Sequence, residues 1–286
     1  MALAMCLIPG RANAQTEVLG LDIPEDVINS AVASVKSDDF LTGNIGDAAQ
    51  LIKGKVAGLD IAKGTGNPSE YSTIMLRGVT SLLGGFTPLI LIDGVEGSLN
   101  TVSPENIAEI SVLKDASAAA IYGTRGASGV ILITTKSGKR GERYNVSYSG
   151  YGAISDFAKT ADFMDAAYMR SLGEEMSEYT AFPDLGEDTD WLGLVSRTGW
   201  VQNHNISLEG GTESMTYSAN VSYRQNEGVI KGSFANDLRA QMDISQYLFN
   251  DILKVRLNML KSISESDNQE SEHIYHQAVT HNPTSP

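Results

Sequence analysis

The strongest constraint on the fold is an alternation of apolar and polar side chains through the second half of the chain. The alternation is clear in Ser214–Gln225, Asn236–Gln246 and Leu253–Met259, and weaker in Tyr144–Ser149 and Trp200–Gly210. Side chains of a β-strand point alternately to opposite faces, so each segment predicts a strand with one apolar and one polar face. Such strands suit the half-buried sheet of a soluble sandwich. They also suit a membrane barrel, whose apolar face meets lipid and whose polar face lines a wet lumen.

The first residues point to export from the cytoplasm. Residues 1–14 contain an apolar run and end in an Ala-Asn-Ala cleavage site before Gln15, as in a secretory signal peptide. The basic start of such a peptide is missing, so we expect the signal to be truncated. Cys6 is the single cysteine, so no disulfide framework is expected. Beyond Gln15 no apolar run reaches the roughly 18 to 20 residues of a spanning helix, and a membrane form would have to be a β-barrel.

Three observations favour the barrel over the sandwich. They are the predicted export, strands of about 9 to 12 residues that approach membrane-spanning length, and Tyr and Trp side chains at several strand ends, as in an aromatic girdle. The predicted strands are too few to close a barrel around a domain, which takes about 22. We therefore expect residues 139–286 to be the first strands of an incomplete barrel and the chain to be a fragment. The net charge of −14 argues against a nucleic-acid groove, which needs a basic face.

The segment before these strands, residues 47–138, predicts a compact α+β domain of short elements. Caps and turn residues mark the expected helix ends, and consecutive apolar residues mark a strand covered on both faces. The expected elements are a helix from Asp47 through Lys53, strands at Thr73–Val79 and Thr87–Val95 with a turn at Asp93-Gly94, a helix opening at Ser103 and Pro104, a strand at Ile110–Leu113, a helix from Asp115 to Gly123, and a covered strand at Val130–Ile133. Residues 15–46 are polar with little periodicity, and we expect an extended N-terminal segment there.

An ordered series of long motifs resembles the plug of SusC/RagA-type TonB-dependent outer-membrane transporters. The motifs are "LIKGKVAGLDI", "STIMLRGVTSL", "PLILIDGV", "SPENIAEISVLKDASAAAIYGTRGASGVILITTKSGK" and, near the end of the chain, "HNPTSP". The resemblance covers roughly residues 45–286. The plug residues that it singles out for structure or gating are Arg77, Gly78, Asp93, Gly94, Lys114, Asp115, Tyr122, Gly123, Gly126 and Gly129. The fold that it implies is an α+β plug domain followed by antiparallel strands of a transmembrane β-barrel.

The resemblance implies active import of large nutrients, oligosaccharides or peptides, across an outer membrane. The implied partners are TonB with ExbB–ExbD, a SusD-like surface lipoprotein and outer-membrane lipid. TonB would pair by strand addition with a TonB box before the plug. The candidate box is Thr16, Glu17, Val18, Leu19, Gly20 and Leu21. A simple linker is the alternative reading of these six residues.

Other functions find little support in the sequence. Gly123, Gly126 and Gly129 lack the lysine and hydroxyl residue of a phosphate loop, and turn geometry explains them better. Arg77 and Asp93 could switch partners during gating or could fix the shape of the plug. No cofactor, catalytic residue or metal site is expected: His273, His276 and His281 lack a completing ligand, and the acids of Asp184–Asp190 read as a polar loop. A secreted soluble binding protein and an exported carbohydrate-active enzyme remain as alternatives.

Overall fold

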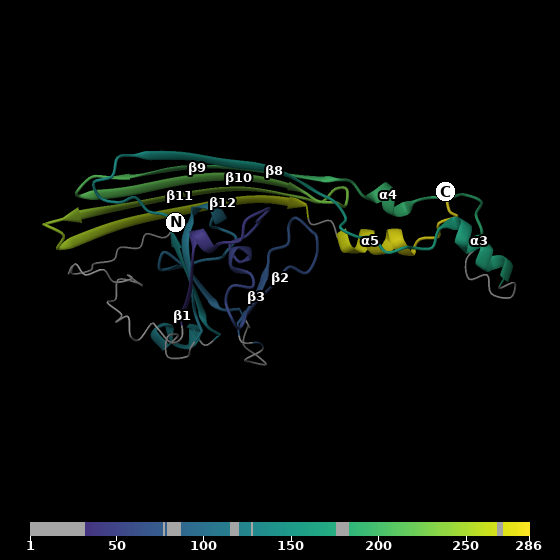
Figure 1. Ribbon diagram of the computed structural model, residues 1–286, viewed down its shortest axis with the longest axis horizontal. Helices are drawn as coiled ribbons and strands as arrows, with labels where there is room; N and C mark the ends of the chain where they lie inside the picture. The colour runs from purple at the N-terminus through teal and green to yellow at the C-terminus, as the bar shows by residue number, and fades with distance from the viewer. Residues whose placement is uncertain are drawn as a thin grey trace.

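The computed structural model describes residues 32–76, 78, 87–114, 120–126, 128–175, 183–267 and 271–286. The signal peptide, the candidate TonB box, Arg77 and Asp115 lie outside these residues. The chain forms a long, curved sheet with a smaller domain against one of its faces and a helical extension at one end (Figure 1). We call the sheet the wall and the smaller domain the plug.

The plug is built on a mixed sheet with strand order β1-β6-β7-β4-β5. Its centre, β7, pairs antiparallel with β6 and parallel with β4. All residues of Val130–Ile133 are buried, which confirms the prediction of a strand covered on both faces. The strands are β1 Val32–Lys36, β4 Leu89–Ile92, β5 Val95–Glu96, β6 Ile107–Leu113 and β7 Val130–Thr135.

The N-terminal segment differs from our expectation. We expected residues 15–46 to be an extended segment ahead of the plug, but β1 is an edge strand of the plug sheet. It pairs antiparallel with β6, with Val32 opposite Leu113 and Lys36 opposite Glu109. Only Val35 of this strand is buried, so the strand carries too short an apolar pattern to be recognised in the sequence.

The predicted helices of the plug are shorter than expected. Asp47 does accept a hydrogen bond from the Gln50 amide at 3.2 Å, but only one 3₁₀ turn comes after it, and Gly54 then adopts a φ of +74°. The chain at Ser103 and Pro104 likewise makes one 3₁₀ turn, and β6 then begins earlier than predicted. The short elements are the 3₁₀ turns η1 Ser37–Asp39, η2 Gln50–Ile52, η3 Pro104–Asn106 and η4 Ala120–Gly126, and the hairpin strands β2 Leu59–Ala62 and β3 Thr73–Leu76.

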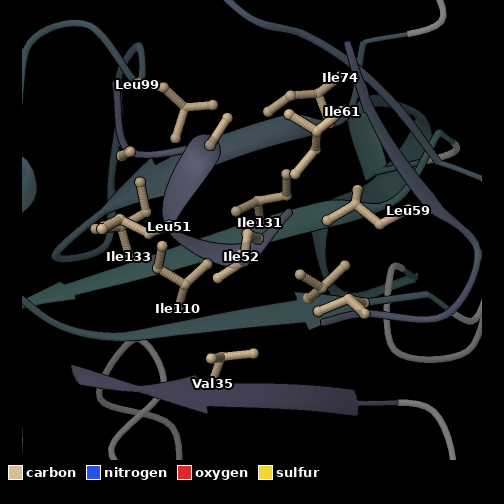
Figure 2. Packing of buried hydrophobic residues seen from close by; sticks show 14 of the residues in the cluster. Val35, Leu51, Ile52, Leu59, Ile61, Ile74, Leu99, Ile110, Ile131 and Ile133 are labelled. Atoms are coloured by element: carbon tan, nitrogen blue, oxygen red, sulfur yellow. The ribbon is translucent and has the colours of Figure 1, made fainter. Parts of the chain in front are cut away.

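The apolar core of the plug lies on one face of its sheet. Ile110, Ile131 and Ile133 project from the sheet toward Ile52 of the 3₁₀ turn and toward the β2–β3 hairpin (Figure 2). A second, smaller cluster on the opposite face contains Leu91, Leu113, Val130 and Leu132, with Tyr122 packed against it. Burial of apolar surface therefore holds this domain together in the ordinary way.

The wall is a purely antiparallel sheet whose strands succeed one another in chain order, β8 to β12. All the segments predicted from the alternation are strands, and most are longer than expected, up to 15 residues. The strands are β8 Asn145–Ser155, β9 Gly199–Gly211, β10 Met215–Glu227, β11 Phe234–Leu248 and β12 Leu253–Asp267.

The two ends of the wall differ in their connections. Residues 212–214 and 249–252 form short turns at one end. At the other end the long β8–β9 connection carries α3 Ala166–Glu175 and α4 Trp191–Val195, and α5 Ser271–Thr280 comes after β12 (Figure 1). None of the helices in the described ranges combines the length and apolar character that crossing a membrane requires.

Candidate functional site

The face of the wall that contacts the plug is polar, and the opposite face is apolar and exposed. Asn220 on the plug side is 3% exposed, whereas Ile206 on the outer side is 53% exposed. The buried polar residues of the wall strands are Asn203, Asn205, Ser207, Thr216, Ser218, Asn220, Ser222, Arg224, Asp237, Arg239, Gln241, Asp243 and Ser245. The exposed apolar residues of the wall include Val146, Tyr148, Ile206, Val221, Tyr223, Leu238, Met242, Met259 and Ile263.

This arrangement reverses the usual distribution in a water-soluble protein, where sheets bury their apolar faces. An exposed apolar face of this extent needs an apolar neighbour. The lipid-facing side of a membrane barrel provides that neighbour, and the polar face then lines the lumen. A soluble sandwich would show the opposite burial.

Asp93 is the centre of the plug's contact with the wall. It occupies the turn after β4 with a φ of +50°, and its side chain is 2% exposed. Its carboxylate accepts hydrogen bonds from the backbone amide of Thr135 at 3.0 Å and from the Thr135 hydroxyl at 2.7 Å. These bonds hold the turn after β4 against the end of β7, where both strands meet the wall.

Wall residues complete the surroundings of this carboxylate. Gln241 Nε2 donates to Asp93 Oδ2 at 3.2 Å, and Asn258 Nδ2 donates to the same oxygen at 3.3 Å. Arg256 Nη2 lies 3.5 Å from Asp93 Oδ1. Arg256 Nε donates a hydrogen bond to Asp243 Oδ2 at 2.6 Å. A buried carboxylate requires such partners, so Asp93 ties the plug to β11 and β12 at once. We call Asp93, Gln241, Asp243, Arg256 and Asn258 the Asp93 network.

A second contact joins the wall to the beginning of the plug. Arg224 on β10 donates hydrogen bonds to the backbone carbonyl of Ile45 at 2.8 Å and to the Tyr151 hydroxyl at 2.7 Å. It also donates a hydrogen bond to the side-chain oxygen of Asn44. On β11, Arg239 donates to the carbonyl of Asn100 at 2.7 Å. Charged wall residues thus bind plug backbone, and the Arg224 contact lies on the segment that leads back toward β1.

A polar cavity of about 190 Å³ lies beside the Arg224 contact, between plug and wall. Thr65 donates to the Glu70 carboxylate from its amide at 2.7 Å and from its hydroxyl. The hydroxyl bond is the main reason that the pKa of Glu70 is lowered. The cavity is lined by Asn44, Gly46, Asp47, Gln50, Lys63, Pro68, Glu70, Tyr71, Arg224, Asn226, Ala235 and Asp237.

The remaining predicted plug residues are spread through the domain rather than gathered at one place. Gly78 and Gly94 are exposed turn residues with positive φ. Lys114 donates to the carbonyl of Ala57 at 3.1 Å. The Tyr122 hydroxyl is buried without a hydrogen-bond partner among the described residues, and burial raises its pKa.

The glycines after Tyr122 serve backbone geometry and close packing. Gly123 adopts a φ of +62° inside η4, and the carbonyl of Gly126 accepts from the amide of Gly129 at 2.9 Å. Gly129 has a φ of +92°, and a Cβ built there would lie 2.1 Å from a methyl carbon of Leu76. A side chain does not fit at this position, which is where the chain enters β7.

The sequence analysis did not predict that the wall residues of the Asp93 network contact the plug. Their signal was present: Asp243 and Arg256 are charged residues at inward positions of neighbouring strands, and Ser245 is the partner of Arg256 in the register. The alternation alone did not show which inward residues meet the plug.

At the end of the wall that carries the long connections, the "HNPTSP" segment packs against the β8–β9 connection. Trp191 stacks on His281 with ring centroids 4.6 Å apart and donates from its indole nitrogen to the carbonyl of Asn282. Asp190 caps α4, and Asp184 pairs with Arg170. No cluster of three possible metal ligands occurs within the described residues.

Comparison with known proteins agrees with this architecture. Residues 25–130 match the family model of the TonB-dependent receptor plug domain. The TonB-dependent receptor SusC of Bacteroides thetaiotaomicron is 33% identical over 247 residues, which cover 82% of this chain and 25% of SusC. The TonB-dependent receptor P26 of Formosa agariphila is 28% identical and is covered to a similar extent.

Solved structures show the same fold. A chain of the RagAB peptide importer in its open-open state superposes with a TM-score of 0.74 at 26% identity, covering 84% of this chain and 31% of that chain. The siderophore receptor PirA of Acinetobacter baumannii, at 16% identity and a TM-score of 0.56, shares the fold. The chain spans about a quarter of SusC and under a third of the RagAB chain.

These matches relate both the plug and the wall of this chain to known proteins. The matched proteins are receptors and importers rather than enzymes. The mixed sheet corresponds to their plug, and the antiparallel strands resemble the start of their barrel. The chain therefore belongs to the SusC/RagA-type TonB-dependent receptors.

Proposed function

We propose that this chain supplies the plug and part of the wall of an outer-membrane importer for large nutrients. The observation that carries the proposal is the reversed burial of the wall, polar toward the plug and apolar toward the outside. An energised importer needs a lumen that is filled at rest and a wall that is stable in lipid. The chain has both parts in contact.

We further propose that the protein is exported and works with the partners that the family implies. TonB, driven by ExbB–ExbD, would bind the candidate box at Thr16–Leu21 by strand addition. This box precedes β1, so force applied there would reach the edge of the plug sheet first. A SusD-like lipoprotein would deliver an oligosaccharide or a peptide; the kinship with SusC and with the RagAB peptide importer supports this class of substrate.

Deletion of Thr16–Leu21 in the complete reading frame tests this proposal. We expect the deletion to abolish nutrient-dependent growth and cross-linking to TonB while the protein still fractionates with the outer membrane. A deletion of the same length within 22–30 is the matched control and should retain uptake. Uptake that survives loss of Thr16–Leu21 would contradict the assignment of the box.

The Asp93 network is our candidate for the contact that must break when the plug moves. Gln241 Nε2 lies 3.0 Å from Thr135 Oγ1 across the interface, so a short thiol-reactive cross-linker with a reducible bond can span cysteines placed at these two positions. The cross-linker is added in a background from which other reactive cysteines have been removed. We expect cross-linking to block uptake and reduction to restore it. Equal uptake by the cross-linked and reduced forms would exclude movement at this contact.

A further inference from the structure

The chain passes from the plug to the wall beside the short turns. Among the described residues, the last hydrogen bond of this passage to the plug is donated by the amide of Lys136 to the carbonyl of Asn106, at 2.8 Å. Gly138, two residues further on, already packs against the wall. Residues 138–142 stay in contact with the ends of β9 and β10, and we call them the strap. The passage therefore has a plug side and a wall side, with Ser137 between them.

Close backbone packing holds the strap against the wall. A Cβ built at Gly138 would overlap the carbonyl oxygen of Gly210 and would lie 2.5 Å from that of Tyr217. These two wall residues are partners in the β9–β10 register. A Cβ at Gly211 would lie 2.5 Å from the carbonyl oxygen of Lys139. Glycine in a strand often marks a place where another backbone approaches closely, and here the strap fits the wall because side chains are missing on both sides of the contact.

Hydrogen bonds join the strap to the β9–β10 turn in both directions. The Gly141 amide donates to the carbonyl of Thr212 at 3.3 Å, and the Gly211 amide donates to the carbonyl of Glu142 at 3.1 Å. The second bond lies just beyond the end of the β8–β9 ladder. The strap is therefore attached to the backbone of the wall before β8 begins.

Arg140 extends the contact to the neighbouring turn. Its guanidinium donates to Asp251 at 2.8 Å and lies over the ring of Tyr247, with its central carbon 3.4 Å from the ring centroid. Asp251 follows Phe249 and Asn250 in the β11–β12 turn, where all three residues have positive φ, a conformation that is uncommon outside glycine. An exposed ion pair and a cation–π contact are each weak. Together with the backbone contacts, they tie the strap to both short turns of the described wall.

The two ends of the plug are thus held differently. At its N-terminal end, β1 is an edge strand with Val35 as its only buried residue. At its C-terminal end, the strap is packed and hydrogen-bonded to the wall. Thr135 and Asp93, which contact the wall through the Asp93 network, lie on the plug side of Ser137. Hinges are a few loop or element-terminal residues that absorb a change of φ and ψ, and Ser137 occupies such a place, between one plug contact and one wall contact.

We propose that the strap is a fixed anchor and that Ser137 is the hinge about which the plug leaves its seat on the wall. This inference rests on the proposed function, in which force is applied at the N-terminal end of the plug. The Asp93 network would then open while residues 138–142 stay on the wall. A plug anchored in this way returns to the same seat after each cycle. The competing possibility is that the strap peels away and the whole plug moves free of the wall up to β8.

Two cross-links on opposite sides of Ser137 test the hinge in the complete receptor. The first is the cross-link between positions 135 and 241, which should block uptake. The second joins Arg140→Cys to Asp251→Cys with a reducible linker as long as the arginine side chain that it replaces. We expect uptake to be the same before and after reduction of this second cross-link, with the extent of cross-linking read from gel mobility. Uptake that the strap cross-link blocks and reduction restores would overturn the hinge.

Hydrogen exchange of the strap amides tests the anchor separately. Arg140→Ala should speed their exchange by on the order of fivefold, the factor expected from one exposed ion pair and one cation–π contact. Gly138→Val should have a larger effect, because its side chain would overlap the Gly210 carbonyl. Lys139→Ala is the control, because the partner of Lys139, Glu142, belongs to the strap itself. Unchanged exchange in both Arg140→Ala and Gly138→Val would overturn the anchor.

These measurements separate failure of the hinge from failure of the proposed function. Uptake blocked by both cross-links would reject the hinge and leave the importer standing. Uptake blocked by neither would reject movement of the plug away from the wall, and the hinge with it. Absence of TonB-dependent uptake by the wild-type receptor would reject the proposed function, and exchange of the strap amides would still decide whether the strap is anchored.

Discussion

The two five-stranded sheets of this molecule bury opposite kinds of side chain. The plug sheet encloses Ile110, Ile131 and Ile133 in its apolar core. The wall buries Asn220 and Asp243 and leaves Val221 and Met242 exposed. Both patterns follow from the same two rules: apolar faces are stable against apolar neighbours, and buried polar faces need hydrogen-bonding partners. The difference teaches that alternation defines two faces, while the environment decides which one is hidden.

The largest expected effect comes from the plug core. Ile131 is fully buried, so Ile131→Ala should lower the free energy of unfolding by about 2–5 kcal/mol through lost contacts and a cavity. Val221→Ala on the exposed face of the wall should change it by far less in detergent. Hydrogen exchange of plug amides in both variants measures the contrast. A larger effect at Val221 than at Ile131 would break the comparison.

The neighbouring residues Met242 and Asp243 give the next test within a single strand. Asp243→Leu removes one of the two carboxylates that Arg256 and Asn258 share and leaves them only Asp93, so it should destabilise the plug–wall contact by up to about 3 kcal/mol. Met242→Leu should be nearly neutral, as for a volume-conserving change. Protease sensitivity of the plug in the inserted protein reports the contact. In a soluble sheet with the opposite orientation, the leucine at 243 would be the favourable change.

Gly129 tests how closely the plug is packed. Gly129→Ala should cost about 1–3 kcal/mol, because alanine is strained at a φ of +92° and its Cβ would overlap Leu76. Gly66→Ala, at a site with open space and no positive φ, is the control and should change little. Thermal unfolding of the plug compares the two, and equal midpoints would show that Leu76 moves aside at no cost.

The smallest expected effect is a pH dependence at the cavity between plug and wall. The Thr65 hydroxyl and amide lower the pKa of Glu70 below its ordinary value. A lowered folded pKa means that the stabilisation is complete above the unfolded value and is lost as the pH falls through the folded one. Exchange of the Thr65 amide should therefore be faster, relative to its intrinsic rate, under acid conditions in wild type. Glu70→Gln should remove that dependence, and an unchanged profile would contradict the assignment.

Much of the fold could be predicted from the sequence because alternation is a local signal. The wall strands were predicted from it directly, and the buried strand at Val130–Ile133 was predicted from its consecutive apolar residues. β1 could not be predicted, because a strand with Val35 as its only buried residue has almost no pattern. The plug helices were overestimated, since a good capping residue such as Asp47 does not fix the length of the helix after it.

The candidate site was only half predictable for a different reason. The sequence singled out Asp93 at the Asp93-Gly94 turn as a candidate residue. Its partners Gln241 and Asn258 lie on the wall, far from Asp93 in the sequence. A polar residue at an inward position looks alike in sequence whether it faces water, another strand or the plug. Only the packing of the two sheets against each other selects Arg256 and Asp243 for the network.

Spin labels at Val221 and Ser222 test the central claim most directly, because these neighbours lie on opposite faces of β10. Val221 is 48% exposed and Ser222 is 3% exposed. In the complete receptor reconstituted in lipid, a nitroxide at 221 should collide with oxygen far more often than with a water-soluble nickel complex, and one at 222 should be immobile against the plug. A label at 221 that prefers the nickel complex would contradict the claim that the apolar face of the wall meets lipid.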